Sequence, residues 1–303
     1  MRAFTSFIRP LRSLMCALGL LAFVHAASAA DTAQQQQAAI EAAIQAMQAA
    51  QVKGPSDIKL RDQATLKLPA GYVWIPEPAA GQYMKAMGNH PDDRELGLIF
   101  PQADNENWVI VAEYEPAGYI KDDDAKKWDV DEMFKSLKEG TEAANEERRG
   151  QGFPELEIVG WVEKPAYAAD THRLIWSMSA RHKGAAADEP MSINYNTYAL
   201  GREGYISLNL ITQLKDIARD KQHAQVMLSA MQHEDGKRYA DFNASTDKVA
   251  EYGLAALVGG LAAKKLGMFA LMAGVLAKFG KVLLLGAAAL GGVATKFFKK
   301  KQA

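Results

Sequence analysis

The sequence predicts an α+β protein, with a mostly antiparallel sheet covered by helices and a C-terminal transmembrane helical tail. Three observations support this prediction. Short segments rich in β-branched and aromatic residues recur between turn residues through the middle of the chain. Two intervening segments carry apolar residues at helical spacing, and the last fifty or so residues are apolar apart from lysines. Strands that follow one another around a few helices are typical of antiparallel α+β folds.

Residues 1–29 are predicted to be a secretory signal peptide. Three arginines precede the apolar run Leu14–Val24, and Ala27-Ser28-Ala29 supplies the small-residue cleavage pattern. The apolar run would rise about 16 Å as a helix, too little for a hydrocarbon core of about 30 Å. An uncleaved anchor is the alternative. Cys16, the only cysteine, lies in this segment, so the mature chain would have no disulfide and no thiolate metal site.

Charge is distributed unevenly along the chain. The whole sequence has 35 Lys and Arg residues against 36 Asp and Glu residues. The first 30 residues hold three arginines, and residues 251–303 hold eight lysines and a single acid, Glu251. Subtracting these leaves 24 bases and 35 acids for residues 31–250, a net charge of −11. An acidic middle repels phosphate, which argues against nucleic-acid binding.

Residues 30–56 are predicted to be an Ala/Gln-rich linker or a short helix. Ile40, Ile44 and Met47 share one helical face, and Gly54-Pro55 ends the segment. An acidic α+β extracytoplasmic domain is predicted over 57–245. Its first strands are expected at 58–60, 64–68, 71–75, 95–100 and 108–114, with a helical turn at 82–87.

A helix is expected directly after this group of strands. Asp129 can cap its N-terminus, and Glu132 occupies the capping-box position. Arg148 and Arg149 would lie in its last turn, where the helix dipole favours cations, and Gly150 would end it.

The second half of the domain reads as longer strands. These are expected at 157–162, 171–182, 192–200 and 205–211, with a hairpin turn at 201–204, a helix around 224–231 and a last strand at 238–242. In the strand 171–182, Leu174, Trp176 and Met178 share one face. Ser245 and Thr246 are predicted to cap a helix that runs toward the membrane.

Residues 246–303 are predicted to be a hydrophobic helical membrane tail. From Tyr252 to Phe298 the charged residues are all lysines. Val282–Phe298 is the expected spanning core, with Lys281 at one interface and Lys299–Lys301 at the other, because lysines near helix ends can snorkel. The positive-inside rule places this lysine triplet in the cytoplasm. A two-helix hairpin and a helix lying on the membrane surface remain as alternatives.

Glycines recur every seven residues in the first part of this tail. Gly253, Gly260, Gly267 and Gly274 would form a small-residue face where another helix could approach closely. The hypothesis is helix packing or self-association. The alternative is a low-complexity apolar tail in which glycine and alanine merely dominate.

Two groups of residues are candidates for partner binding. The acidic run Asp122, Asp123 and Asp124 could hold Ca²⁺ or contact a partner, or it could be a solvated loop with helix-capping aspartates. The second group lies on predicted strands and their turn and consists of Trp176, Asn194, Tyr195, Asn196 and Arg202. It could bind sugar or peptide, or it could be an ordinary strand face. The motif search indicates no catalytic residues, no metal site and no cofactor.

Several phrases resemble a known family. They are Leu68-Pro69-Ala70-Gly71-Tyr72, Glu113-Tyr114-Glu115 with Gly118-Tyr119-Ile120, Asp122-Asp123-Asp124-Ala125, Asn194-Tyr195-Asn196-Thr197, Gly204 to Asn209, and Gly236 to Phe242 leading into Tyr252-Gly253-Leu254. The family is one of uncharacterised bacterial membrane-anchored proteins, a domain of unknown function sometimes labelled a predicted regulator of amylopullulanase. The resemblance implies no catalytic residues. The element order is also similar to PsbP-like domains, which implies a binding or assembly role.

Together these observations predict a non-enzymatic, membrane-anchored extracytoplasmic binding or assembly module. Its main domain would be periplasmic, its tail would contact lipid, and its partner would be a protein or a second copy of itself. The alternatives are an envelope hydrolase acting on glycans, which needs two carboxylates across a cleft, and a membrane-active oligomerising protein.

Overall fold

The α+β prediction is confirmed. The computed structural model describes residues 37–259 apart from 88, 90, 104, 151–153 and 187. An eight-stranded sheet has the order β1-β4-β5-β6-β10-β9-β8-β7, and a three-stranded sheet has the order β11-β3-β2. Neighbouring strands in both sheets are antiparallel.

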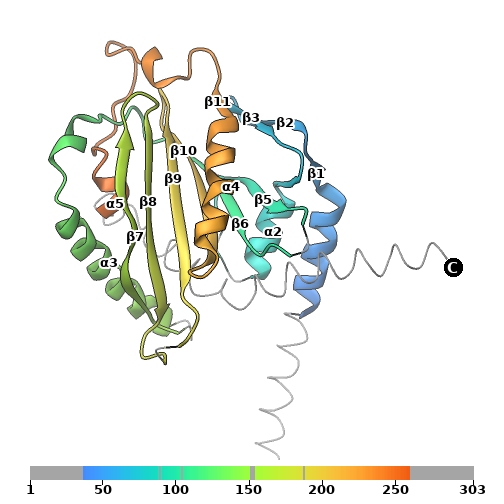
Figure 1. Cartoon of the computed structure of the whole chain (residues 1–303). Helices are drawn as coiled ribbons and strands as arrows, with labels where there is room; N and C mark the ends of the chain where they lie inside the picture. Colours follow the sequence, from blue (N-terminus) through green and yellow to red (C-terminus); the bar gives the residue numbers. More distant parts are fainter. Residues whose placement is uncertain are drawn as a thin grey trace, which may run out of the picture.

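The elements alternate between strands and a few helices along the chain (Figure 1). The strands are β1 (Val52–Lys53), β2 (Ser56–Leu60), β3 (Ala64–Leu68), β4 (Tyr72–Pro76), β5 (Glu95–Pro101), β6 (Val109–Glu115), β7 (Leu156–Ala168), β8 (Arg173–His182), β9 (Ser192–Leu200), β10 (Tyr205–Gln213) and β11 (Met231–His233). The helices are α2 (Ala79–Ala86), α3 (Val130–Gly150), α4 (Ile217–Ala230) and α5 (Ala256–Gly259), with 3-10 turns η1 (Asp123–Lys127) and η2 (Tyr239–Asp241). Residues 37–50 are also helical.

The large sheet is covered on both faces. One face, here face A, carries Ile110, Tyr195 and Leu208 and packs against α4 and the small sheet. The opposite face, face B, is covered at two places. Helical residues 37–50 and α2 pack on the β4–β5–β6 part, whereas α3 and α5 pack on the β7–β8 part (Figure 1).

The large sheet is covered on both faces, which explains why apolar and polar side chains of β8 are both buried. Leu174, Trp176 and Met178 lie on face B, as the alternation predicts. Ser177 and Ser179 point to face A and are also buried, because α4 and its neighbours cover that side. The serines therefore do not mark a solvent-exposed face.

Several predicted boundaries were wrong for local reasons. The helical turn expected at 82–87 is the longer helix α2, and α4 begins at Ile217 and ends before Met231, which starts β11. β7 continues through Pro165 to Ala168, with register shifts against β8. His172 adopts a left-handed conformation (φ 53°), so β8 begins only at Arg173.

The strand expected at 238–242 is the 3-10 turn η2. Side chains close this turn locally, since the backbone N–H of Arg238 donates to Asp241 Oδ2 at 3.0 Å. The hydroxyl of Tyr239 donates to the carbonyl of Ile120 at 2.8 Å, and the ring of Phe242 stacks on Tyr119. These tertiary contacts override the local preference for an extended strand.

The last described segment, residues 243–259, folds back onto the domain and is called the strap. Its Val249 forms a parallel bridge with Tyr119, and Leu254, Leu257 and Val258 are buried in the cluster under α3. The first part of the predicted tail is therefore packed on the protein. Ser245 and Thr246 do not cap a helix but form a turn with Asn243, and α5 begins at Ala256.

Gly253 lies close to a carboxylate of the same chain. A Cβ at this position would lie 2.6 Å from Asp124 Oδ2, so the glycine allows the strap to approach Asp124. The other predicted residues of the tail lie outside the described residues: Gly260, Gly267, Gly274, Lys281, Val282, Phe298 and Lys299. Within the described ranges, no helix combines the length and apolar character needed to cross a bilayer.

Replacing Asp124 with alanine is expected to loosen the end of the strap. The carboxylate of Asp124 accepts hydrogen bonds from the backbone N–H groups of Leu254 at 3.2 Å and Ala255 at 2.9 Å. Loss of such a cap costs about 1 kcal/mol. Hydrogen exchange of residues 252–258 should therefore accelerate several-fold. Asp123→Ala is the control, because Asp123 is exposed; equal acceleration in both variants would contradict the capping role.

Candidate functional site

The predicted partner-binding residues do not converge on one place. Asn194, Asn196 and Trp176 lie on face B of the sheet, whereas Tyr195 points to face A. Arg202 lies in the β9–β10 turn, and the Asp122–Asp124 run lies at η1. These residues therefore form separate groups in the fold.

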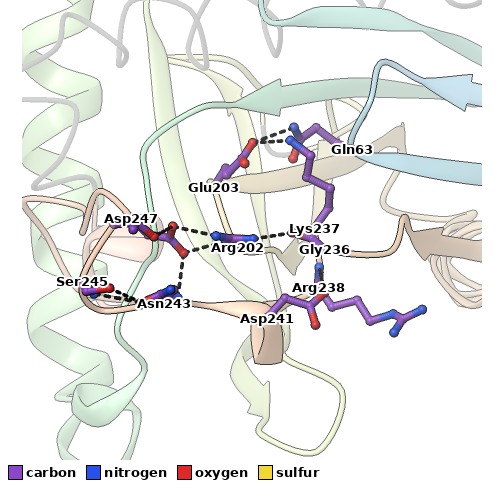
Figure 2. Close-up of polar contacts among 11 residues, drawn as sticks. Gln63, Arg202, Glu203, Gly236, Lys237, Arg238, Asp241, Asn243, Ser245 and Asp247 are labelled. Atoms are coloured by element: carbon purple, nitrogen blue, oxygen red, sulfur yellow. Dashed lines mark hydrogen bonds and ion pairs between the residues drawn. The ribbon is translucent and has the colours of Figure 1, made fainter.

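Arg202 fastens the strap to the β9–β10 turn (Figure 2). Its guanidinium donates to both carboxylate oxygens of Asp247, at 2.7 and 2.8 Å, and to the carbonyl of Gly236 at 3.1 Å. Asp247 also accepts from the backbone N–H of Asn243 at 2.7 Å. The Arg202 hydrogen bonds hold the pKa of Asp247 below its usual range. The donors of Arg202 are thus engaged within the chain.

The neighbouring residue Glu203 extends the same network. Its carboxylate accepts from Lys237 Nζ at 2.7 Å and from Gln63 Nε2 at 3.0 Å (Figure 2). The turn is therefore tied both to the start of β3 and to the loop before η2. This network holds the fold together, and its geometry does not point to a ligand.

The Asp122–Asp124 run also makes contacts within the chain. Asp122 Oδ2 accepts from the hydroxyl of Tyr167 at 2.8 Å, and that hydroxyl lies 3.1 Å from His172 Nδ1. Asp124 caps the strap, as described above. Among the residues that the structure describes, no group of three or more His, Cys, Asp or Glu residues is placed to hold a metal ion. The acidic run therefore holds parts of the chain together: Asp124 caps the strap, and Asp122 accepts a hydrogen bond from Tyr167.

Face B carries a polar stripe in the middle of the sheet, between the parts that the two groups of helices cover. The register pairs Glu95 with Glu113 and Glu113 with Ser207 across β5, β6 and β10. Two residues further along, Val111 pairs with Asn209, Asn209 with Asn196 and Asn196 with Trp176. Side chains of residues two apart share a face. The polar stripe is defined by the following residues: Glu95, Glu113, Ser207, Asn209, Asn196 and Asn194.

Apolar residues border the polar stripe on both sides. Leu98, Val111 and Ile211 belong to the cluster under α2. Tyr198 and Trp176 belong to the cluster under α3 and α5. Polar side chains thus cross four strands of a sheet whose neighbouring positions are apolar, a distance of about 15 Å at the usual strand spacing.

The polar stripe contains buried acceptor atoms without hydrogen-bond partners. Glu95 is 6% exposed, Asn194 is 3% exposed and Asn196 is fully buried. Within the described residues, both carboxylate oxygens of Glu95 and the amide oxygens of Asn194, Asn196 and Asn209 are unpaired. The amide nitrogen of Asn196 donates to the carbonyl of Asn194 at 3.2 Å, which leaves its oxygen as the free atom. Such orphaned groups are rare in native proteins and call for an explanation.

The electrostatics of the polar stripe favour a protonated carboxyl group in the absence of a ligand. Burial raises the pKa of Glu95 to about 8, and repulsion from Glu77, Glu113 and Asp92 adds to this. Burial also raises the pKa of Glu113, although Arg94 opposes the shift. The guanidinium of Arg94 donates to Asp92 at 3.0 Å and to Glu115 at 3.2 Å, and therefore does not pair with Glu95.

Sequence reasoning missed both carboxylates of the polar stripe. Glu113 follows Val109 and Val111 at the same parity within a strand, and this signal could have marked it as inward-facing. Glu95 lies at the first position of its strand, where parity is harder to assign. Asn194 and Asn196 were identified as candidates, but their proximity to Glu113 depends on pairing between β6 and β10.

Comparison with known proteins gives one family match. A family described as "Protein of unknown function (DUF2167)" matches residues 52–291. No curated protein matches the chain significantly.

Two solved structures show distant similarity. One is the cyanobacterial PsbP protein (CyanoP) from Synechocystis sp. PCC 6803, with 11% identity, a TM-score of 0.36 and coverage of 61% of this chain and 91% of that one. The other is the Ran-binding protein Mog1p of Saccharomyces cerevisiae, with 10% identity, a TM-score of 0.31 and coverage of 58% and 94%. These neighbours include the PsbP type anticipated from the element order, but at such TM-scores they carry no functional argument.

Proposed function

Because the chain belongs to the DUF2167 family, whose function is unknown, we propose a function from its own residues: a non-enzymatic binding or assembly module. The polar stripe is the proposed contact site for the partner. The observation that carries this proposal is the set of buried, unpaired acceptors on Glu95, Asn194 and Asn196. A binding partner that donates hydrogen bonds would satisfy them, and an unsatisfied buried acceptor is otherwise destabilising.

Membrane anchoring and export are part of the proposal. They rest on the signal peptide predicted for residues 1–29 and on residues 260–303, in which lysines separate apolar segments. In this arrangement the domain is extracytoplasmic and the lysine-rich C-terminus is cytoplasmic. The acidic charge of the domain argues against nucleic acid as a partner. The described residues give no reason to extend the proposal to the regulation of amylopullulanase.

A hydrolase is the alternative, and the raised pKa of Glu95 is the feature that favours it, since a protonated carboxyl can act as a general acid. Glycoside hydrolysis requires a second carboxylate on the other side of the scissile bond. Glu95 and Glu113 instead lie side by side on adjacent strands of one face. This arrangement suits binding better than hydrolysis.

Partner capture from cells tests the proposal. The full chain, solubilised in mild detergent, should retain a specific protein that survives removal of residues 260–303. Glu95→Gln combined with Glu113→Gln should abolish capture, whereas Asp57→Asn, an exposed carboxylate on β2, should leave it unchanged. Turnover of a glycan by the purified chain, lost with Glu95→Gln, would favour the hydrolase instead.

Fractionation and a reporter fused after Ala303 test the anchor. We expect the mature chain in the membrane fraction, released only by detergent, and a reporter that is active in the cytoplasm. Recovery of the full-length mature chain in the soluble fraction would contradict the anchoring part of the proposal while leaving the binding part in place.

A further inference from the structure

We infer that the polar stripe holds a protonated amine or guanidinium group carried on an apolar stem, with Glu95 and Glu113 as its charged partners and Asn196 and Asn209 as neutral acceptors. This inference rests on the proposed binding function and names the chemical class of the group that is bound.

The unpaired atoms of the polar stripe are acceptors. They are the carboxylate oxygens of Glu95 and the amide oxygens of Asn194, Asn196 and Asn209. The hydroxyl of Ser207 already donates to Glu113 at 3.3 Å. A complementary ligand must therefore supply donors. An ammonium group supplies three N–H donors and a guanidinium supplies five, and neither carries an acceptor.

The acidic residues around Glu95 also favour a cationic ligand. Glu95 is surrounded by Glu77 from the loop before α2, Asp92 from the loop before β5 and Glu113 from β6. The nearby cation, Arg94, is shared between Asp92 and Glu115. A ligand cation would therefore enter a site of net negative charge in which Glu95 is buried and Glu113 is half-buried. Charge-assisted hydrogen bonds to carboxylates are stronger than neutral ones.

The walls of the polar stripe favour an organic cation over a metal ion. Val111 and Ile211 border it on one side, and Tyr198 and Trp176 border it on the other. Calcium requires six to eight oxygen ligands, and the described residues contain no suitable cluster. Apolar and aromatic borders can instead pack against the methylene stem of an amine or guanidinium.

Binding of a cation should be linked to proton release. Burial and the neighbouring carboxylates hold Glu95 largely protonated below its pKa of about 8. A cation beside the carboxyl favours the ionised form, so binding at pH 7 would release a proton from Glu95. Affinity should therefore rise between pH 6 and pH 8 and then level off.

Calorimetric titration of the full chain in mild detergent tests the inference. The probes are butylamine and butylguanidine, with 1-butanol as the uncharged control. At pH 7 we expect saturable binding of both cations and none of butanol, with heats that differ between phosphate and MOPS buffers, neither of which is a primary amine, because a proton is released. Equal binding of butanol, or heats that do not depend on the buffer, would overturn the inference.

Variants keep the test specific to the polar stripe. Glu95→Gln and Glu113→Gln should each weaken amine binding at least tenfold, and Glu95→Gln should also reduce the buffer dependence. Asp57→Asn should change neither. If Glu95→Gln does not fold, Glu113→Gln carries the test by itself. Unchanged affinity in a folded Glu113→Gln variant would overturn the assignment of the carboxylate pair.

The same titration distinguishes the source of the cation and separates the two proposals. Higher amine affinity in Lys264→Gln/Lys265→Gln would identify the lysines of the chain itself as competitors. Displacement of a captured protein by butylamine would identify a side chain of the partner. If the double glutamine variant loses its partner but the wild type binds no amine, the ligand class is wrong and the binding function stands. If the wild type binds amines but captures no partner, the ligand class is right and the proposed binding of a partner protein is wrong.

Discussion

Glu95→Gln is expected to stabilise the folded protein at pH 8 and to leave it nearly unchanged at pH 4.5. Glu95 is 6% exposed and its carboxylate oxygens lack partners within the described residues. Burial, with repulsion from Glu77, Glu113 and Asp92, raises its pKa from 4.5 to about 8. Between these values the folded state keeps a proton that the unfolded state has lost. Stability therefore falls as pH rises through this window.

The size of the effect follows from the same linkage. Each pH unit in the window costs about 1.4 kcal/mol, and the neighbouring titration of Glu113 shares part of the shift. We therefore expect glutamine to stabilise by on the order of 3 kcal/mol at pH 8. Urea denaturation of the wild type and the variant from pH 4.5 to 9 measures this, with Asp57→Asn as the control. Parallel stability curves for Glu95→Gln and wild type would show that Glu95 is not a buried titrating group.

Gly204→Ala is expected to destabilise the protein by about 3 kcal/mol, because overpacking against a backbone cannot be relieved by a change of rotamer. Gly204 has a φ of 156°, and a Cβ there would lie 1.9 Å from the carbonyl oxygen of Glu115 and 3.1 Å from the nitrogen of Ala117. The β9–β10 turn would have to move away from the end of β6. That movement would also disturb Arg202 and Glu203, which fasten the turn to the strap and to Gln63.

A matched glycine provides the control. Gly160 lies on β7, and a Cβ there would meet nothing within 4 Å. Gly160→Ala should therefore change the free energy of unfolding by less than about 1 kcal/mol. Equal stability of the two variants in denaturant titrations would mean that the close approach of Gly204 to β6 does not constrain the fold.

Local patterns predicted much of this fold. The helix that begins after Asp129 and ends at Gly150 was expected from three signals: its N-terminal cap, the arginines in its last turn, which the helix dipole favours, and its terminal glycine. The turn between β9 and β10 was expected from its composition, and the face of β8 that carries Trp176 from simple alternation. In each case the deciding interactions lie within a few residues along the chain.

Non-local pairing decided what the sequence could not predict. The polar stripe exists because β6 pairs with β10, which brings Glu113 beside Ser207, a neighbour far away in the sequence. Tertiary burial likewise decided the strap. Leu254, Leu257 and Val258 are apolar enough to suit lipid, but they pack under α3 instead. Hydrophobicity alone does not distinguish a lipid environment from a protein core.

The way the strap is attached determines how the domain responds to tension from its C-terminal end. Pulling on residue 259 first strains α5 and the Asp124 cap, then the hydrogen bonds of Lys248 and Ala250 with Tyr119, and only then the Arg202–Asp247 pair. The strap can thus detach from the domain in stages, before any strand of the large sheet is pulled from its neighbours.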